Sequence, residues 1–171
     1  MRGPVRHSGV QRTSPGCAIV SVGASGRSNS PWVPGRARAA KKDGIGNVTK
    51  VLYIEHDDDN LYMLKMRLER VGDFEVLAAG DSEKGCKLAL TERPDVILMD
   101  LEMSVVDRWQ PVRALKNDPQ TRDIPIIGMS AYALDSEREQ AVATGSDEFD
   151  VKPIEFDALL ATIRRVVANP R

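Results

Sequence analysis

The sequence predicts a doubly wound α/β domain, in which a five-stranded parallel sheet is built from a βα unit repeated five times. From residue 49 onward, short apolar and β-branched runs alternate with segments of helical period, and this alternation is typical of βα units around a parallel sheet. Residues 1–47 show neither pattern and hold eight of the thirteen glycines and four of the ten prolines. We therefore expect a domain over residues 48–171 that follows an N-terminal tail.

Five short runs are expected to form the strands. They are rich in Val, Ile, Leu and Phe, and each is short enough for a strand of a parallel sheet. In chain order they read KVLYI at 50–54, FEVLAA at 74–79, DVILMD at 95–100, IPIIGMS at 124–130 and EFDVKP at 148–153.

The first and last helices are predicted by apolar stripes at helical spacing. The stripe of the first helix consists of Leu61, Leu64, Leu68 and Val71. Gly72 is placed to end this helix in a left-handed turn. Its beginning is expected to be capped by Asp58, Asp59 and Asn60, which also complement the helix dipole. The stripe of the last helix consists of Phe156, Leu159, Leu160, Ile163, Val166 and Val167.

The other three helices have weaker patterns. Residues 82–91 and 134–144 have helical period with Ala-rich inner faces. The third helix begins near Asp107, which puts Pro111 in its first turn, where a missing N–H costs little. Cys86 and Trp109 are expected to pack in the core, as a small apolar residue and a large one.

The charge is unevenly distributed along the chain. The formal net charge is -1, but residues 1–42 carry eight Lys or Arg and no Asp or Glu, which leaves about -9 on the remainder. A domain this acidic lacks the basic surface that releases counterions from phosphates, so we expect no direct nucleic-acid binding. The apolar run CAIVSVGA in the tail is too short to span a bilayer, so we expect no membrane association.

The tail allows several interpretations. Its composition cannot bury enough surface to offset chain entropy, which favours disorder. A basic interaction arm or an organellar transit peptide would have the same composition. The start could also be misassigned, because a bacterial GTG codon at Val48 would begin the protein just before its first strand. Cys17 and Cys86 cannot form a disulfide framework and fit a reducing cytosol, so we expect a cytoplasmic protein.

Polar residues follow the apolar runs at four places. The first strand ends in Glu55, His56 and Asp57, the third in Asp100, the fourth in Ser130, and the fifth in Lys152 before Pro153. Ligands of an open α/β sheet lie beyond the carboxyl ends of its strands, so we expect these groups to meet at one edge.

This set suits phosphoryl transfer to a carboxylate. Asp100 would be the nucleophile, and a divalent cation held by the acids after the first strand would offset charge on the phosphoryl oxygens. Lys152 would pair with a second oxygen, and Ser130 would donate a hydrogen bond to a third. Asp100 must then be within reach of solvent. The resulting acyl phosphate would bias a two-state switch in the surrounding loops.

With these residues, the stretch 49–168 resembles the receiver domain of two-component response regulators, which has a flavodoxin-like fold. The separation of Asp100, Ser130 and Lys152 matches that family, and the phrases LKNDPQTRDIPIIGMSAYA and TGSDEFDVKPIEFDALLATI resemble its stand-alone chemotaxis and cell-division members. The resemblance implies that Asp100 is the phosphorylated residue and that Ser130 is the hydroxyl residue of the switch. Lys152 would be the family's lysine, followed by a cis-bonded Pro153.

The resemblance also implies further roles and partners. Phe149 would be the aromatic rotamer switch, and the backbone carbonyl of Glu102 would complete a Mg²⁺ shell formed with Glu55 and Asp100. A sensor histidine kinase or a phosphotransfer protein would donate the phosphoryl group. The signal would pass to an unknown downstream protein through the surface of the fourth helix, fifth strand and fifth helix, with no output domain in the chain. Such a protein is a signalling domain rather than an enzyme, and a monomer or weak dimer.

The sequence departs from the family at His56, which stands where a second metal-binding acid is usual. Mg²⁺ prefers oxygen ligands in octahedral geometry, and a neutral imidazole is a soft ligand without charge. Two smaller departures follow the acceptor, where Ser104 and Arg108 replace the usual proline and glycine. A side chain at 108 would need a conformation that glycine takes freely, so this loop is expected to be reshaped.

Three interpretations of His56 remain open. Glu55 with Asp57 or Asp58 could still hold the cation through water, with weaker Mg²⁺ affinity. His56 could instead select a transition metal such as Mn²⁺. In the third interpretation, the domain is a pseudo-receiver that binds partners without phosphorylation.

Other roles also compete. A phosphatase with Asp100 as nucleophile and Glu102 as second acid would want a substrate-capping segment, which we do not find. Phe149 has a plainer alternative role in packing.

Overall fold

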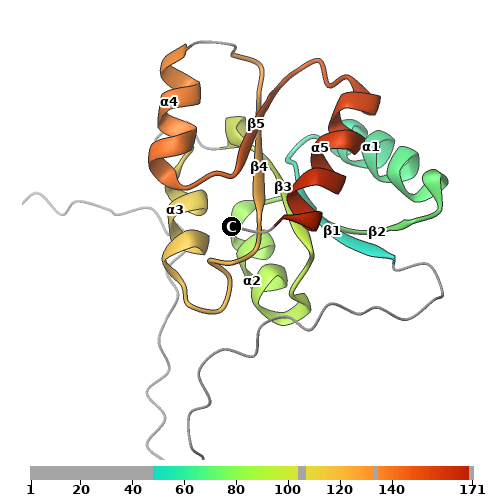
Figure 1. Cartoon of the computed structure of the whole chain (residues 1–171), viewed down its shortest axis with the longest axis horizontal. Coiled ribbons are helices and arrows are strands. Elements are labelled where there is room, and N and C mark those ends of the chain that lie inside the picture. The colour runs from blue at the N-terminus through green and yellow to red at the C-terminus, as the bar shows by residue number, and fades with distance from the viewer. Residues whose placement is uncertain (1–47, 104–106, 133–134, 170–171) are drawn as a thin grey trace, which may run out of the picture.

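The computed structural model describes residues 48–103, 107–132 and 135–169. Within these ranges five strands alternate with five α-helices along the chain (Figure 1). The expectations for the tail of residues 1–47 and for Ser104 lie outside the described residues. In the described part of the chain, no helix is both long enough and apolar enough to cross a bilayer.

All five strands belong to one parallel sheet with the order β2-β1-β3-β4-β5. The strands are β1 (Thr49–Ile54), β2 (Phe74–Ala79), β3 (Val96–Asp100), β4 (Ile126–Ser130) and β5 (Glu148–Val151). The chain order reverses between β1 and β3, which places a crevice at the carboxyl ends of these two strands. The predicted doubly wound parallel sheet is therefore confirmed. β5 ends one residue earlier than expected, so Lys152 begins the loop that follows it.

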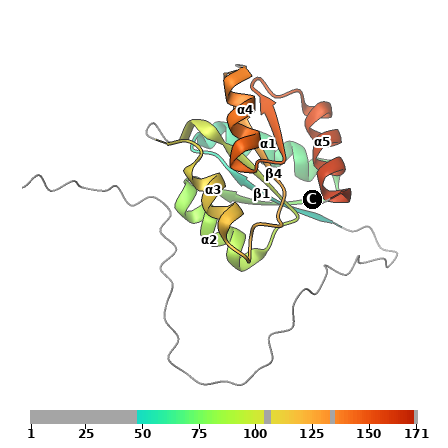
Figure 2. The same cartoon turned by 60° about the vertical axis from the view of Figure 1, so that its left-hand side comes forward.

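The helices cover both faces of the sheet (Figures 1 and 2). Their bounds are α1 (Asp58–Val71), α2 (Ser82–Glu92), α3 (Gln110–Asn117), α4 (Asp135–Thr144) and α5 (Phe156–Ala168), with a short 3₁₀ turn, η1, at Leu101–Met103. Buried residues of α1 and α5 pack on one face of the sheet, and those of α2, α3 and α4 pack on the other. Burial on both faces explains why the central strands read as continuous apolar runs.

The first helix begins and ends at side chains suited to those positions. Asp57 caps α1, because its carboxylate accepts a hydrogen bond from the backbone N–H of Asn60 at 2.8 Å. The cap is thus one residue earlier than predicted, and Asp58 and Asp59 lie in the first turn. Gly72 closes the helix in the left-handed conformation, with φ of 94°, as its position predicted.

Packing of the predicted core residues is largely confirmed. Leu64, Leu68, Cys86 and Trp109 are buried. Val71, at the end of α1, is exposed instead. α3 starts at Gln110, three residues later than expected, but Pro111 still lies in its first turn.

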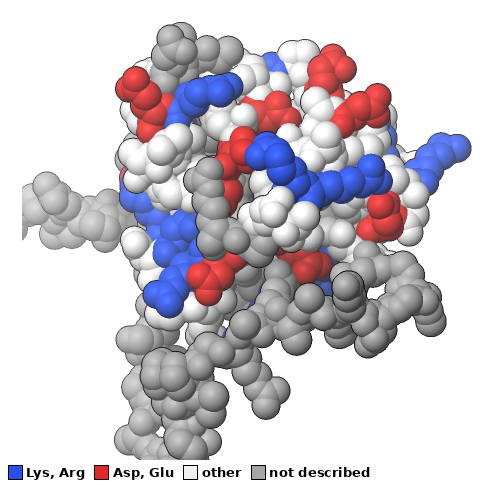
Figure 3. Space-filling model, in the orientation of Figure 1, with Lys and Arg blue, Asp and Glu red and all other residues white. Residues whose placement is uncertain are grey.

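The surface of the described residues carries charges of both signs. On the face seen in Figure 3, acidic and basic side chains are interspersed rather than gathered into one large patch of a single sign. Several lie in ion pairs between elements, such as Arg165 of α5 with Glu148 of β5 at 2.6 Å.

Candidate functional site

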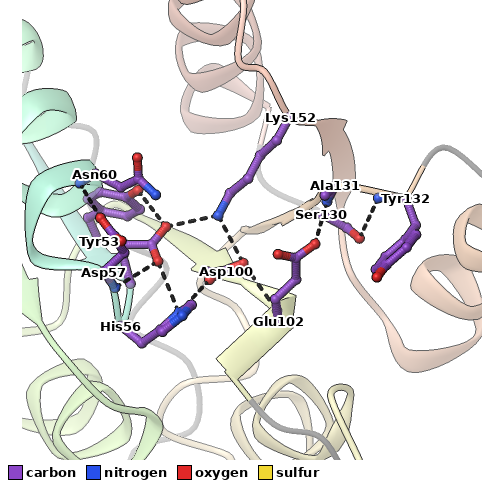
Figure 4. A network of polar contacts seen from close by, with 11 residues as sticks. Tyr53, His56, Asp57, Asn60, Asp100, Glu102, Ser130, Ala131, Tyr132 and Lys152 are labelled. Atoms are coloured by element: carbon purple, nitrogen blue, oxygen red, sulfur yellow. Dashed lines mark hydrogen bonds and ion pairs between the residues drawn. The ribbon is translucent and has the colours of Figure 1, made fainter.

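The carboxyl ends of β1, β3 and β5 bring three charged side chains together (Figure 4). Glu55 follows β1 directly, Asp100 is the last residue of β3, and Lys152 follows β5. Glu55 is fully buried and Asp100 is 1% exposed. Two buried carboxylates at one edge require positive charge nearby, because an unpaired buried charge is costly.

Lys152 supplies part of that charge. Its ammonium lies 3.0 Å from Oε2 of Glu55 and 3.1 Å from Oδ1 of Asp100, so it bridges the two acids. Burial lowers the pKa of Lys152, but its hydrogen bonds and ion pairs with both carboxylates outweigh burial and raise the pKa above its ordinary value. The peptide bond from Lys152 to Pro153 is cis, as the resemblance implied.

Two further groups hold Glu55 in place. The hydroxyl of Tyr53 donates to Oε2 of Glu55 at 3.0 Å, and the backbone N–H of Asp57 donates to Oε1 at 3.1 Å. Burial, together with the charge of Glu55, raises the pKa of Tyr53 far above its ordinary range. Sequence reasoning missed Tyr53 because it lies inside an apolar run. The available signal was that the hydroxyl of a buried tyrosine needs a hydrogen-bond partner.

His56 lies against both carboxylates. Its Nδ1 atom is 3.0 Å from Oδ2 of Asp100 and 3.2 Å from Oε1 of Glu55. The His56 side chain is 56% exposed, whereas those of the two acids have no exposed area. The expectation that Asp100 lies within reach of solvent is therefore wrong for this arrangement. His56 and Lys152 both contact the Asp100 carboxylate, and a phosphoryl donor could reach it only after one of them moves.

Among the described residues, one group of three or more His, Cys, Asp or Glu side chains could hold a metal ion. It consists of Glu55, His56 and Asp100, whose potential ligand atoms all lie within 4.8 Å of one another. The donor set is two carboxylate oxygens and one imidazole nitrogen, which fits Mg²⁺ poorly because Mg²⁺ prefers an all-oxygen shell. Asp57, an alternative ligand in the sequence prediction, uses its carboxylate to cap α1. Asp57 and His56 were the two alternatives for a further metal ligand, and the geometry brings His56 to Glu55 and Asp100.

Glu102 contacts the site at two points. Its backbone N–H donates to Oδ1 of Asp100 at 3.1 Å, which fixes the carboxylate at the start of η1. Its side chain turns toward β4, where Oε1 accepts a hydrogen bond from the backbone N–H of Ala131 at 2.8 Å (Figure 4). The backbone N–H that follows Ser130 is therefore already hydrogen-bonded to the Glu102 carboxylate.

Two predicted residues are not brought to Asp100. The hydroxyl oxygen of Ser130 accepts from the backbone N–H of Tyr132 at 3.1 Å, and in Figure 4 it points toward Tyr132 and away from Asp100. Phe149 is half-buried in β5 and packs against the core on the α2, α3 and α4 side of the sheet. Its contacts are those of a packing residue, and its switch role stays a prediction.

Arg108 joins the region after β3 to α4. Its guanidinium lies 3.3 Å from Oε1 of Glu137, and its Cζ atom lies 5.6 Å from the ring centroid of Tyr132. A glycine at this position could make neither contact. The arginine thus links the two segments that flank Asp100 and Ser130.

Comparison with known proteins identifies the family and gives the same fold. The model of the response regulator receiver domain matches residues 51–164. Protein PilH of Pseudomonas aeruginosa is 31% identical over 122 residues, which cover 71% of this chain and all of PilH. The polar-differentiation response regulator DivK of Brucella anthropi is 28% identical, over 70% of this chain and 96% of DivK. Several other curated relatives are longer, and the chain spans between 25% and 53% of their length.

A solved structure bears directly on the metal. The receiver domain of a sensor histidine kinase from Pseudomonas aeruginosa, with a magnesium ion coordinated in its active-site cleft, is 26% identical. It superimposes with a TM-score of 0.64 over 71% of this chain and 98% of that domain. Receiver domains bind Mg²⁺ at an acidic cluster, and the corresponding cluster here includes an imidazole.

Proposed function

The chain belongs to the response regulator receiver domain family, and from this premise we propose that it is a stand-alone response regulator that accepts a phosphoryl group on Asp100. Receiver domains are signalling domains that interact with histidine kinases or phosphotransfer proteins. We assign the domain to residues 48–171. The stand-alone form is supported by PilH and DivK, which this chain covers over 100% and 96% of their length.

One observation carries the proposal, namely the bridge that Lys152 forms between Glu55 and Asp100. In the transfer, an Asp100 oxygen forms a bond to phosphorus while the bond from phosphorus to the donor's nitrogen or oxygen breaks. Lys152 would keep its contact with Glu55 and pair with a phosphoryl oxygen, which places positive charge where negative charge develops. Its raised pKa keeps the ammonium protonated throughout the ordinary pH range.

The step requires two side chains to move. His56 must leave its contact with Asp100 to admit the donor, and Ser130 must turn its hydroxyl from Tyr132 toward the phosphoryl group. The second movement would release the backbone N–H of Tyr132, at the segment between β4 and α4. A change at Asp100 would thus reach the surface of α4, β5 and α5, where we place the contact with a downstream protein. The phosphoryl donor would be a sensor histidine kinase or a phosphotransfer protein, and the chain itself a monomer or weak dimer in the cytoplasm.

The donor set also bears on the cation. Because Mg²⁺ fits two carboxylates and an imidazole poorly, we assign this chain a weaker Mg²⁺ affinity than a receiver with an acid in place of His56. Interspersed surface charge supports contacts with proteins rather than with nucleic acid.

A second candidate function is favoured by the position of His56. The imidazole fills the approach to Asp100 and hydrogen-bonds to it at 3.0 Å, so the domain could hold one conformation without phosphorylation and bind its partner in that form. In this pseudo-receiver, Glu55, His56, Asp100 and Lys152 would be a structural network.

The intact mass of the protein after incubation with acetyl phosphate and Mg²⁺ tests these alternatives. We expect the wild type to gain one phosphoryl group and the Asp100→Asn variant to gain none. A His56→Asp variant should gain the group faster. An adduct that appears only in His56→Asp supports the pseudo-receiver, and an adduct that persists in Asp100→Asn contradicts the assignment of the acceptor.

A further inference from the structure

We propose that Glu55, His56 and Asp100 form a binding site for a divalent first-row transition cation, such as Zn²⁺, with Nδ1 of His56 as the nitrogen ligand. This inference deepens the proposed function, because it assigns a different class of metal to the same site. It rests on the arrangement of the donor atoms and on the charge of the cluster.

The donor atoms are spaced as the ligands of one ion. With metal–ligand bonds of about 2.0–2.2 Å, neighbouring ligands of a tetrahedral or octahedral ion lie roughly 3 to 3.6 Å apart. Nδ1 of His56 lies 3.0 Å from an Asp100 oxygen and 3.2 Å from a Glu55 oxygen. All three donor atoms are within 4.8 Å of one another. A cation could therefore be bound by a small displacement of the exposed imidazole.

The charge of the cluster favours a cation. Glu55 and Asp100 are both buried. Among the described lysines and arginines, Lys152 alone lies within ion-pair distance of them. One negative charge is thus left without a fixed positive partner when the imidazole is neutral, and a buried uncompensated charge is unfavourable. A neutral imidazole is also the form that binds metal, so both requirements are met by a dication at Nδ1.

The nitrogen ligand decides the class of metal. Imidazole suits Zn²⁺, Fe²⁺, Ni²⁺ and Cu²⁺, whereas Mg²⁺ holds its waters and selects oxygen. Asp57 cannot restore an all-oxygen set without giving up the cap of α1, where its carboxylate accepts from Asn60. The exposed side of His56 leaves room for water to complete the shell.

The test is a Zn²⁺ titration of the full chain, followed by calorimetry and by ¹⁵N NMR of the imidazole nitrogens. The chain has two histidines, so a shift of one ring identifies the ligand directly. We expect the His56 nitrogens to shift with Zn²⁺ and to stay in place with an equal concentration of Mg²⁺. His56→Ala should weaken Zn²⁺ binding by about tenfold or more, and His7→Ala, the matched control in the tail, should leave it unchanged.

A His56→Asp variant tests selectivity. It should bind Mg²⁺ more tightly and Zn²⁺ more weakly than the wild type. Equal Zn²⁺ affinity in wild type and His56→Ala, or an unmoved His56 resonance in the wild type, would overturn the inference.

The outcome is separable from that of the proposed function. If Zn²⁺ does not bind at His56 but the wild type gains a phosphoryl group on Asp100, the proposed function stands and this inference falls. If Zn²⁺ binds and no adduct forms under any metal, the metal site stands and phosphorylation is excluded.

Discussion

The Nδ1 atom of His56 lies 3.0 Å from Oδ2 of Asp100 and contacts the residue that we propose as the phosphoryl acceptor. The contact joins two strand ends that are 44 residues apart in the sequence. It gives the site a closed arrangement in which the Asp100 carboxylate is hydrogen-bonded to the imidazole, and Lys152 bridges the carboxylates of Asp100 and Glu55. In the reaction that we propose, the exposed ring moves before a donor reaches Asp100, and any metal at this site has that ring as a neighbour.

Replacement of Lys152 by Met should abolish phosphorylation. The variant removes the ammonium that bridges Glu55 and Asp100 and leaves two buried carboxylates without a fixed cation. We expect no adduct with acetyl phosphate and a loss of about 1–3 kcal/mol in the free energy of unfolding. A divalent cation should stabilise Lys152→Met more than the wild type, as urea denaturation with and without cation would measure. Unchanged stability and full phosphorylation together would contradict the bridge.

Replacement of Glu102 by Ala should speed phosphorylation. The Glu102 carboxylate holds the backbone N–H of Ala131, beside the hydroxyl of Ser130 that we expect to bind a phosphoryl oxygen. Its removal frees that amide and lowers the negative charge that an anionic donor meets, so we expect a rate increase of roughly three- to tenfold with acetyl phosphate. Glu139→Ala makes the same charge change at an exposed position of α4 and should leave the rate unaltered. Equal rates for both variants would show that the effect is only long-range charge.

The fold followed from the sequence because its information is local and periodic. Burial on the two faces of one sheet requires apolar runs, such as VILM before Asp100, and apolar helix stripes, such as the one through Leu64 and Leu68. The same rule placed Glu55, Asp100 and Lys152 at one edge, since parallel strands end together. Strand ends and helix starts shifted by one to three residues, because capping depends on which side chain turns back to the backbone, as Asp57 does.

The orientations of the side chains in the site could not be predicted from local, periodic sequence patterns. Whether His56 turns inward to Asp100, and whether Ser130 turns outward to the amide of Tyr132, is set by side-chain rotamers and by tertiary contacts rather than by spacing. The hydrogen bond from Tyr53 of β1 to Glu55, the residue that follows β1, joins two residues that are two apart in extended chain, so their side chains lie on the same side. The sequence therefore offered a signal there, but it was hidden by the apolar run around Tyr53.

Replacement of Tyr53 by Phe should extend the stability of the protein at alkaline pH. The raised pKa of Tyr53 means that the folded state keeps the phenol proton while the unfolded state loses it near the ordinary value of about 10. This contribution is present below pH 10 and is lost as the pH rises above it. We expect the free energy of unfolding to fall less steeply between about pH 10 and 11 in Tyr53→Phe, as urea denaturation monitored by circular dichroism would show. Lys152 contributes to the decline with the same sign in both proteins, so a difference in slope is due to Tyr53. Identical slopes would contradict a buried, protonated phenol.

Replacement of Asp57 by Ala should affect the helix and not the metal. Asp57 caps α1 through the N–H of Asn60, and loss of such a cap costs about 1 kcal/mol in the free energy of unfolding. Asp57→Asn keeps a capping oxygen and should recover most of that stability. Because the Asp57 carboxylate is outside the group of Glu55, His56 and Asp100, cation affinity should stay within about twofold of the wild type in both variants. A loss of cation affinity in both would assign Asp57 to the metal shell.

Replacement of Gly85 by Ala should destabilise the domain, although alanine favours helices. A Cβ atom on Gly85 would lie 2.4 Å from Cδ1 and 2.9 Å from Cγ1 of Ile54, which is fully buried at the end of β1. Overpacking of this kind costs about 1–3 kcal/mol, and the gain from helix propensity is at most about 1 kcal/mol. We expect a net loss of roughly 1–2 kcal/mol in urea denaturation. Gly80→Ala is the matched control, because a Cβ atom there meets nothing within 4 Å, and it should change stability by less than about 0.5 kcal/mol. If Gly85→Ala were as stable as the wild type, Ile54 could shift without cost, and β1 would then not hold Glu55 and His56 in fixed positions through the packing of α2.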